Sequence, residues 1–184
     1  LLILGLVLVM GVFTGWLRDV VAEAQGGIFH SELVQKGLRL GFVLFIVSEV
    51  MFFFAFFWAY FHSSLPILNN VAGTWPDGDL EAIGAGGIPM LNTLILLSSS
   101  VTVTIAHHAI IENDRPKAVR WTGITVLLGV IFLGFQIFEY AELILHSFTI
   151  SDGIYPSTFY MATGFHGFHV LVGTIFLFVC FMRL

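Results

Sequence analysis

The sequence predicts an all-α membrane protein, built as a bundle of five transmembrane helices. Of its 184 residues, 58% are hydrophobic and only 10% are charged, whereas a soluble globular domain carries about 25% charged residues. Five apolar stretches are long enough to cross a hydrocarbon core of about 30 Å as helices. Basic residues occur only in alternate connections, at the adjoining ends of these stretches, or just after the last stretch. A bilayer is therefore the expected solvent for this chain.

A single transmembrane domain is expected over residues 1–184. Its predicted spans cover residues 1–17, 38–62, 88–111, 119–145 and 155–182. The connection at 65–87 is rich in Gly, Pro, Asn and Asp, which form turns and loops. In the turn before the fourth span, Pro116 is suited to begin a helix. No repeat or water-soluble segment interrupts the pattern.

The lysines and arginines predict the orientation in the membrane. With five alternating spans, the seven basic residues all fall on one side, which the positive-inside rule assigns to the cytoplasm or the mitochondrial matrix. These residues are Arg18, Lys36, Arg39, Arg115, Lys117, Arg120 and Arg183. The opposite side carries the acidic residues Asp77, Asp79, Glu81 and Asp152.

Glu49 is the most informative single residue. It lies near the middle of the second predicted span, among phenylalanines. Acidic side chains at this depth usually face the interior of a bundle and serve a proton, ion or binding function. The alternative is a carboxyl group that only bonds a neighbouring helix and stabilises the fold. Glu139 and Glu142 lie nearer a membrane interface, where a solvated or helix-linking acid is the favoured interpretation.

The histidines do not form a convincing metal site. His166 and His169 are three residues apart on the fifth predicted span, but two ligands do not complete a site. We expect them to make interhelical polar contacts, as we do for His62. Cys180 is the only cysteine and stands in an apolar run, which favours a small buried residue. No phosphate-binding loop, nucleophile elbow or haem-attachment motif occurs, so neither a catalytic residue nor a metal ligand is predicted.

Tryptophan–arginine pairs mark the expected headgroup level. Trp16 and Arg18 close the first predicted span, and Arg120 and Trp121 open the fourth. Indole rings settle at membrane interfaces, and arginine attracts anionic headgroups. Generic anchoring at the interface and binding of a specific phospholipid both remain open at this point.

Several motifs, taken in order, resemble the cytochrome c oxidase subunit III family over nearly the whole chain. The matching segments are GLRLG at 37–41, LFIVSEVMFF at 44–53, FWA at 57–59, HSSL at 62–65, LNT at 91–93, AHH at 106–108, FTISDG at 148–153 and ATGFHGFHV at 162–170. The family has seven helices, and the five spans here resemble helices two to six, so that the chain looks incomplete at both ends. Ser147 stands where the family usually has proline.

The resemblance implies an accessory, non-redox core subunit of cytochrome c oxidase, or respiratory complex IV. It implies support for proton uptake, lipid binding and stability of the catalytic subunit, while electrons pass from cytochrome c to oxygen. Haem a, haem a3 and copper would lie in partner subunits, with none in this chain. The expected partners are subunits I and II, accessory subunits and phospholipid; no nucleic acid is expected.

Residue by residue, the resemblance matches Glu49 to the family's carbodiimide-reactive carboxylate. It matches Trp16, Arg18, Arg39 and Arg183 to positions that meet lipid headgroups. It favours the mitochondrial inner membrane, as a multi-pass protein with basic loops facing the matrix; the alternative is a bacterial plasma membrane.

Three other functions stay open at this point. The nearest is subunit III of a quinol oxidase, although the first span here resembles a helix that those enzymes lack. A proton-coupled transporter built on Glu49 would show broken helices and inverted repeats. A membrane metalloenzyme would need more histidines at ligand spacing.

Overall fold

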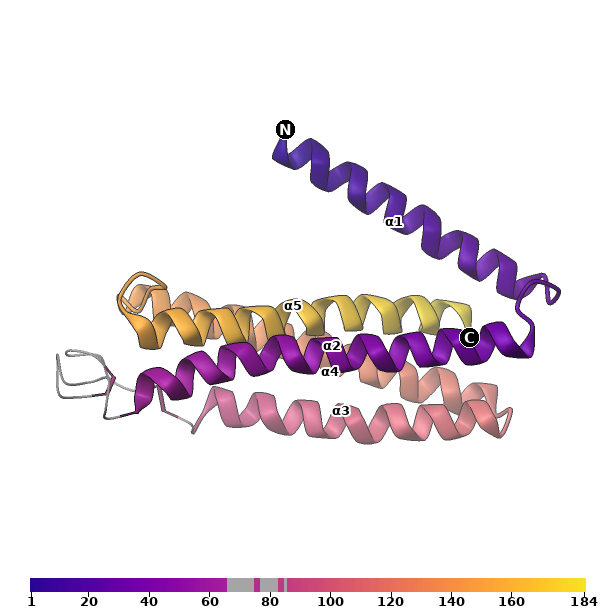
Figure 1. The fold of residues 1–184 in the computed structure, drawn as a ribbon. Helices are drawn as coiled ribbons and strands as arrows, with labels where there is room; N and C mark the ends of the chain where they lie inside the picture. Colours follow the sequence, from indigo (N-terminus) through magenta and orange to yellow (C-terminus); the bar gives the residue numbers. More distant parts are fainter. Residues whose placement is uncertain (66–74, 77–82, 85) are drawn as a thin grey trace. The chain divides into compact units, whose positions relative to one another are not determined.

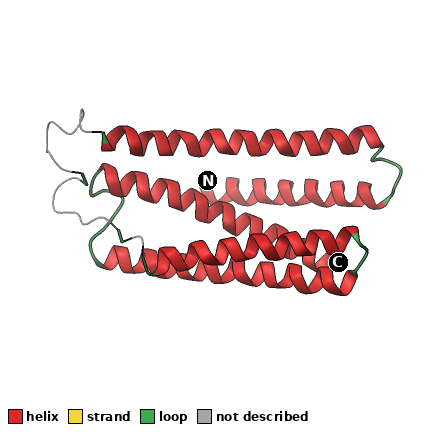
Figure 2. Cartoon of the chain, turned by 90° about the horizontal axis from the view of Figure 1, so that it is seen from below, coloured by secondary structure: helices red, strands yellow, loops and turns green. Residues whose placement is uncertain are grey.

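The computed structural model describes residues 1–65, 75–76, 83–84 and 86–184, and every regular element among them is an α-helix (Figures 1 and 2). The helices are α1 (Leu2–Gln25), α2 (Glu32–Ser64), α3 (Ile88–Ile111), α4 (Arg115–Leu145) and α5 (Ile154–Arg183). All five are long and apolar enough to cross a membrane, which confirms the predicted all-α membrane fold. Asp77, Asp79 and Glu81, which were predicted to lie on the side opposite the basic residues, are outside the described residues.

Some helices continue beyond the apolar stretches that define the predicted spans. Helix α1 runs on to Gln25, and α2 begins at Glu32. Helix α4 starts at Arg115, where Asp114 accepts a hydrogen bond from the backbone N–H of Lys117 at 3.2 Å. Hydropathy marks only the part of a helix that suits hydrocarbon, whereas capping residues decide where the helix begins.

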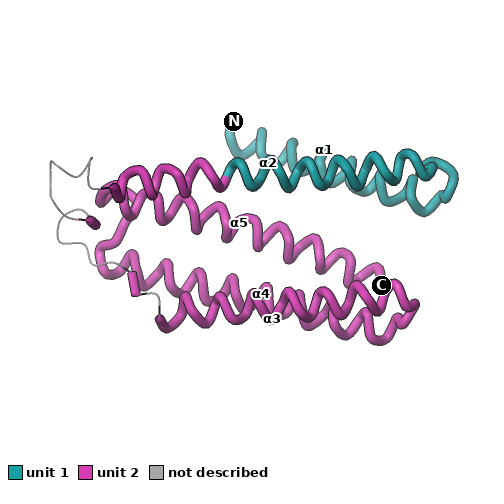
Figure 3. Tube along the Cα trace, turned by 60° about the horizontal axis from the view of Figure 1, so that its bottom comes forward, with its two compact units in different colours: residues 1–52 teal, residues 53–184 magenta. Residues whose placement is uncertain are grey.

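The chain divides into two compact units, Leu1–Phe52 and Phe53–Leu184, and the boundary falls within α2 (Figure 3). The first unit contains α1 and the larger part of α2, and neither helix has a buried residue. In Figure 1 the two helices separate as they leave the turn that joins them. Their leucine, valine and phenylalanine side chains are therefore largely exposed.

The second unit is held together by small residues between α3 and α4. Ala106 and Ala109 of α3 are buried, as is Ala118 of α4. Between the helices, the Oγ1 atoms of Thr102 and Thr125 lie 2.7 Å apart in a buried hydrogen bond. In a membrane, helices associate through close packing and interhelical hydrogen bonds, and small side chains permit both.

Helices α4 and α5 also approach closely at one point. A Cβ atom at Gly129 would lie 2.6 Å from Oγ1 of Thr174, so the absence of a side chain permits this contact. Nearer the other end of the interface, the hydroxyl groups of Tyr140 and Thr163 are 2.5 Å apart. The final part of α2 belongs to this unit as well, and its Phe53 and Phe56 rings contact His169 and Phe165 of α5.

The α4–α5 turn is fixed by a set of short polar contacts. Ser147 adopts a positive φ of 60° after the helix ends, and the N–H of Phe148 returns to the carbonyl of Leu143 at 3.0 Å. The hydroxyl of Tyr160 donates to the Phe148 carbonyl at 2.7 Å. Proline cannot adopt a positive φ, so a proline at position 147 would be incompatible with this backbone.

Candidate functional site

Glu49 lies about halfway along α2 and is half-buried. It stands seventeen residues after Glu32, which places it about 26 Å along a helix that rises 1.5 Å per residue. The residue takes part in an interaction with another group. On the preceding residue, the Ser48 hydroxyl donates to the Phe45 carbonyl at 2.6 Å. Glu49 therefore lies near the middle of α2, and its proton, ion or binding function stays a prediction.

The predicted lipid-binding residues of the first unit are exposed. Trp16 retains 65% of its surface and packs edge-on against Phe13. Arg18 is open to its surroundings, with Nε 3.9 Å from the carboxylate of Asp19. Arg39 is also exposed, in the first part of α2. A shallow apolar groove runs along α1, lined by Leu8, Val9, Val12, Phe13 and Trp16.

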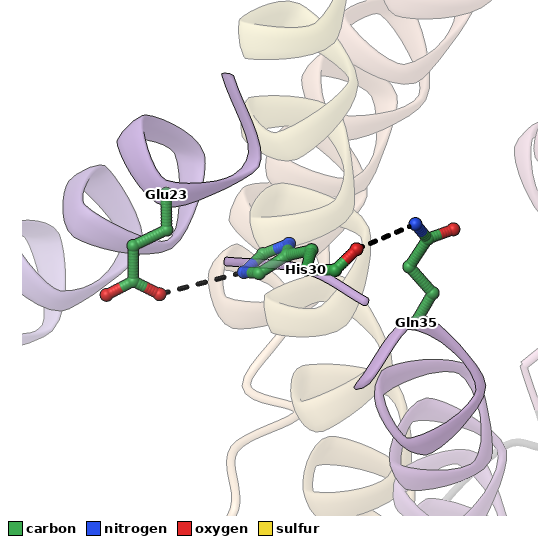
Figure 4. Close-up of polar contacts among 3 residues, drawn as sticks. All are labelled: Glu23, His30 and Gln35. Carbon is green, nitrogen blue, oxygen red and sulfur yellow. Dashed lines mark hydrogen bonds and ion pairs between the residues drawn. The ribbon is translucent and has the colours of Figure 1, made fainter. Parts of the chain in front are cut away.

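A polar turn between α1 and α2 escaped the sequence analysis. Nε2 of His30 lies 3.6 Å from a carboxylate oxygen of Glu23, and the His30 carbonyl accepts a hydrogen bond from Gln35 at 3.0 Å (Figure 4). The Ser31 hydroxyl meets the Val34 N–H at 3.5 Å, in the manner of a helix cap. Each of these contacts joins residues that are seven or fewer positions apart. The polar cluster between two apolar spans was the signal in the sequence.

The three histidines predicted to make interhelical polar contacts lie at different places in the second unit, and the contacts between their rings and other rings do not test that prediction. His169 packs against Phe53 of α2, with ring centroids 5.1 Å apart, and its Nδ1 meets the Phe165 carbonyl of its own helix at 2.5 Å. His166 packs edge-on against Phe132 of α4 at 5.8 Å. His62 is exposed and stacks on Trp58, one turn earlier in α2. The pair on α5 thus contacts two different helices.

The basic ends of α4 and α5 lie together. The Nε–H of Arg115, at the start of α4, donates to the carbonyl of Leu184, next to the exposed Arg183. Nearby, Nζ of Lys117 lies 3.7 Å from the carboxylate of Glu112. The predicted headgroup residue Arg183 therefore belongs to a basic cluster built from two helices.

Asp152 lies in the turn between α4 and α5, at the end of these helices opposite to Arg115 and Arg183. Its carboxylate accepts hydrogen bonds from the Thr149 hydroxyl at 2.7 Å and the Thr149 N–H at 2.5 Å. These donors stabilise the ionised form and lower the pKa of the Asp152 carboxyl below its ordinary value. This acid orders the turn.

The polar interior of the second unit also contains a residue without a sequence-predicted function. Asn92 of α3 is 4% exposed, and neither atom of its amide has a hydrogen-bond partner among the described residues. The motif around it was noticed only as part of the family resemblance. Among the described residues, no group of three or more His, Cys, Asp and Glu side chains is arranged to hold a metal ion.

Comparison with known proteins gives a consistent result. The family model described as cytochrome c oxidase subunit III matches residues 1–184. Among curated relatives named cytochrome c oxidase subunit 3, the one from Arabidopsis thaliana is 54% identical over 183 residues, covering 100% of this chain and 68% of the relative. That from Prototheca wickerhamii is 55% identical, covering 92% of this chain and 63% of the relative. That from Branchiostoma lanceolatum is 51% identical, covering 100% and 69%.

The chain spans about two thirds of the length of these relatives. The names of these relatives give no support to the quinol-oxidase and transporter alternatives. The sequence motifs, the five spanning helices and the family match over all 184 residues agree with one another. The chain therefore belongs to the cytochrome c oxidase subunit III family, whose members are accessory subunits of complex IV.

Proposed function

We propose that this chain supports proton uptake, lipid binding and the stability of the catalytic subunit in a cytochrome c oxidase. Complex IV is an oxidoreductase, and subunit III is an accessory part of it that carries no catalytic centre and no redox cofactor. Haem a, haem a3 and copper belong to the partner subunits in this proposal. The match of a subunit III family model to residues 1–184 is the observation that carries it.

The direct test is spectroscopic. The native complex that contains this chain is purified in mild detergent, and its reduced-minus-oxidised visible spectrum is recorded beside an assay of cytochrome c oxidation. Haem a bands with oxygen-dependent oxidation of cytochrome c are expected. An intact complex that oxidises only quinol, or that contains no haem, would contradict the proposal.

Phospholipid is the proposed ligand of the first unit. The apolar groove on α1 ends at Trp16, and the guanidinium of Arg18 is exposed close to it in sequence. Acyl chains match the groove, and an anionic headgroup matches the arginine, as in other membrane-interface sites. Arg39 and Arg183 are proposed to meet headgroups in the same way.

Arg18→Gln is expected to reduce the phospholipid that remains with the purified complex, because the headgroup loses its charged partner. Native mass spectrometry of the complex measures the bound lipid. Lys117→Gln is the matched control, since it also removes one exposed positive charge but lies far along the chain, beside Glu112. Equal lipid retention in both variants would assign Arg18 to generic anchoring.

Glu49 is the proposed carboxyl group for proton uptake or turnover stability. Its support is its half-buried place at mid-helix depth, where a charge is expensive and is usually retained for function. Glu49→Gln keeps the shape and removes the titration, so assembly should survive while turnover lifetime or lipid retention changes. The control Glu142→Gln alters an exposed acid. If Glu49→Gln leaves both properties unchanged, the carboxyl group is only structural.

The proposed location is the mitochondrial inner membrane, with the basic loops facing the matrix. The contact between Arg115 and the Leu184 carbonyl brings the start of α4 and the end of α5 together. This supports placing the basic residues at these two helix ends on the same side of the membrane. The proposed partners are subunits I and II and further accessory subunits. An impermeant amine reagent should label Lys36 and Lys117 from the matrix side only.

A further inference from the structure

The second unit contains a cavity among α3, α4 and α5 with a volume of about 340 Å³. Its wall combines apolar and polar side chains from all three helices and from the segment before α3. The lining side chains used below are Asn92, Phe132, Gln136, Glu139, Thr163 and His166. No lysine or arginine lines it among the described residues.

Asn92 is the reason to expect a ligand there. Its side chain is 4% exposed, and both Nδ2 and Oδ1 lack hydrogen-bond partners within the described part of the chain. A buried polar group without a partner destabilises the fold, because it has lost its hydrogen bonds to water and gained none in return. Buried polar groups of this kind are normally satisfied by protein or by ordered water. An occupant that both donates and accepts hydrogen bonds would remove this cost.

The polar wall extends from the helix ends towards the middle of the unit. At 1.5 Å per residue, Asn92 lies about 6 Å from the start of α3, and His166 lies about 18 Å from the start of α5. Glu139 lies about 9 Å from the end of α4. Phe132 is 3% exposed and packs against His166 at 5.8 Å, so these two rings bound the deep end.

We propose that this cavity binds a cluster of water molecules anchored by the amide of Asn92. Water supplies both a donor and an acceptor to the amide, and the wall offers further partners at Gln136, Thr163 and His166. A site needs two to four polar partners for each water and about 30 Å³ of volume per molecule in liquid water, so several molecules fit. A phosphate headgroup is disfavoured, because the only formal charge among the lining residues described is that of Glu139.

The cluster would give Glu139 and His166 exchangeable water within the membrane-spanning part of the chain. Neither Glu49 nor the proposed lipid-binding residues of α1 are among the residues that line this cavity. It adds an internal solvent site to the proposed function without depending on that function.

The first test is cysteine accessibility in the purified oxidase complex. Gln136→Cys places a thiol in the cavity wall, while Ile137→Cys places one on the next residue, which is 71% exposed on another face of α4. Thiols react as thiolates, which form only where water reaches them. A water-soluble methanethiosulfonate should therefore modify Gln136→Cys at least about tenfold faster than Ile137→Cys, whose thiol would face lipid. Mass spectrometry of this chain separates both sites from Cys180. Equally slow modification of the two variants would overturn the proposal.

The second test does not depend on the cysteine variants. High-resolution cryo-electron microscopy of the native complex should show compact density peaks within hydrogen-bond distance of the Asn92 amide, and Asn92→Leu should remove them. Continuous density from a lipid, a detergent or another protein segment would overturn the proposal, as would an empty cavity in the native complex.

Discussion

The two units differ in how closely their apolar helices pack. In Leu1–Phe52, neither α1 nor the part of α2 that belongs to this unit has a buried residue, and large side chains such as Leu8 and Phe13 are exposed. In Phe53–Leu184, buried threonine, alanine and glycine residues line the contacts between helices. Both units are strongly apolar, so hydropathy alone does not separate them.

The difference shows what drives association inside a bilayer. Lipid tails are as apolar as leucine, so a large apolar side chain gains little by moving from lipid to protein. Close approach and interhelical hydrogen bonds remain, and both need small or hydroxyl-bearing residues. Helix α1 has glycines too, but a Cβ atom at Gly5, Gly11 or Gly15 would meet nothing within 4 Å. Its surface is therefore suited to lipid.

The largest expected effect comes from adding a methyl group at the close contact between Gly129 and Thr174 in the second unit. Gly129→Ala places a methyl group 2.6 Å from Oγ1 of Thr174, and overpacking of this kind costs about 1–3 kcal/mol. The purified complex should then expose Cys180 to a thiol reagent at a lower temperature, as read by mass spectrometry of this chain.

Two controls make this prediction specific. Gly134→Ala on the same helix and Gly11→Ala in the first unit add methyl groups that meet nothing within 4 Å, so the midpoint should stay unchanged or rise, because alanine favours helix. Adding Thr174→Ala to Gly129→Ala should recover part of the loss. A Gly129→Ala midpoint equal to that of Gly134→Ala would show that the contact is not tight.

A smaller effect is expected from the buried hydroxyl pair between α3 and α4. Thr102→Val keeps the shape of the side chain and removes its 2.7 Å hydrogen bond to Thr125. Interhelical hydrogen bonds in membranes contribute about 0.6 kcal/mol on average, and up to about 1.7. A double-mutant cycle with Thr125→Val, measured by the same Cys180 midpoint, should return a coupling in this range.

The matched control is Thr104→Val, because the Thr104 hydroxyl donates to the Ser100 carbonyl of its own helix, at 2.8 Å, and the residue is exposed. Its midpoint should change less than that of Thr102→Val. Additive effects of Thr102→Val and Thr125→Val would mean that the two hydroxyl groups contribute separately, and that small residues alone hold the seam.

The sequence was sufficient to predict the fold class and the number of spans, because both depend on long apolar stretches and on alternating charge. It could not predict which helices pack closely. Glycines occur on α1 and on α4 alike, but only the structure shows that Gly129 meets Thr174 while Gly11 meets nothing. Pairing of helices depends on contacts between residues far apart in the chain.

The candidate site was predictable to a smaller extent. Glu49 stands out in sequence because a mid-span acid is rare, and the structure places it at mid-helix depth as a half-buried residue. Asn92 could not be identified in this way, since an asparagine four residues into a span is unremarkable until its 4% exposure and unpartnered amide are known. Its proposed importance arises from the wall that α4 and α5 build around it.

The smallest effect is expected at Asp152, where the contact lies outside the spans and competes with water. The Thr149 hydroxyl and N–H lower the pKa of the Asp152 carboxyl, so this contribution to stability is complete above the unfolded-state pKa and is lost as the pH falls through the lower folded-state value. Hydrogen exchange of the 147–155 peptide, corrected for the intrinsic rate, should show faster exchange of the Thr149 amide in Asp152→Asn at neutral pH. The difference from the native chain should disappear in acid.

Thr149→Val is the informative partner of this change, because it removes the hydroxyl donor and keeps the backbone N–H. The Asp152 pKa should then move back towards its ordinary value, and the loss of protection should begin at a higher pH than in the native chain. A difference between Asp152→Asn and the native chain that persists unchanged at low pH would show that the carboxylate does not order this turn. The α4–α5 connection would then depend on the Tyr160–Phe148 hydrogen bond and on contacts inside the membrane, as α3 and α4 do at their buried threonines.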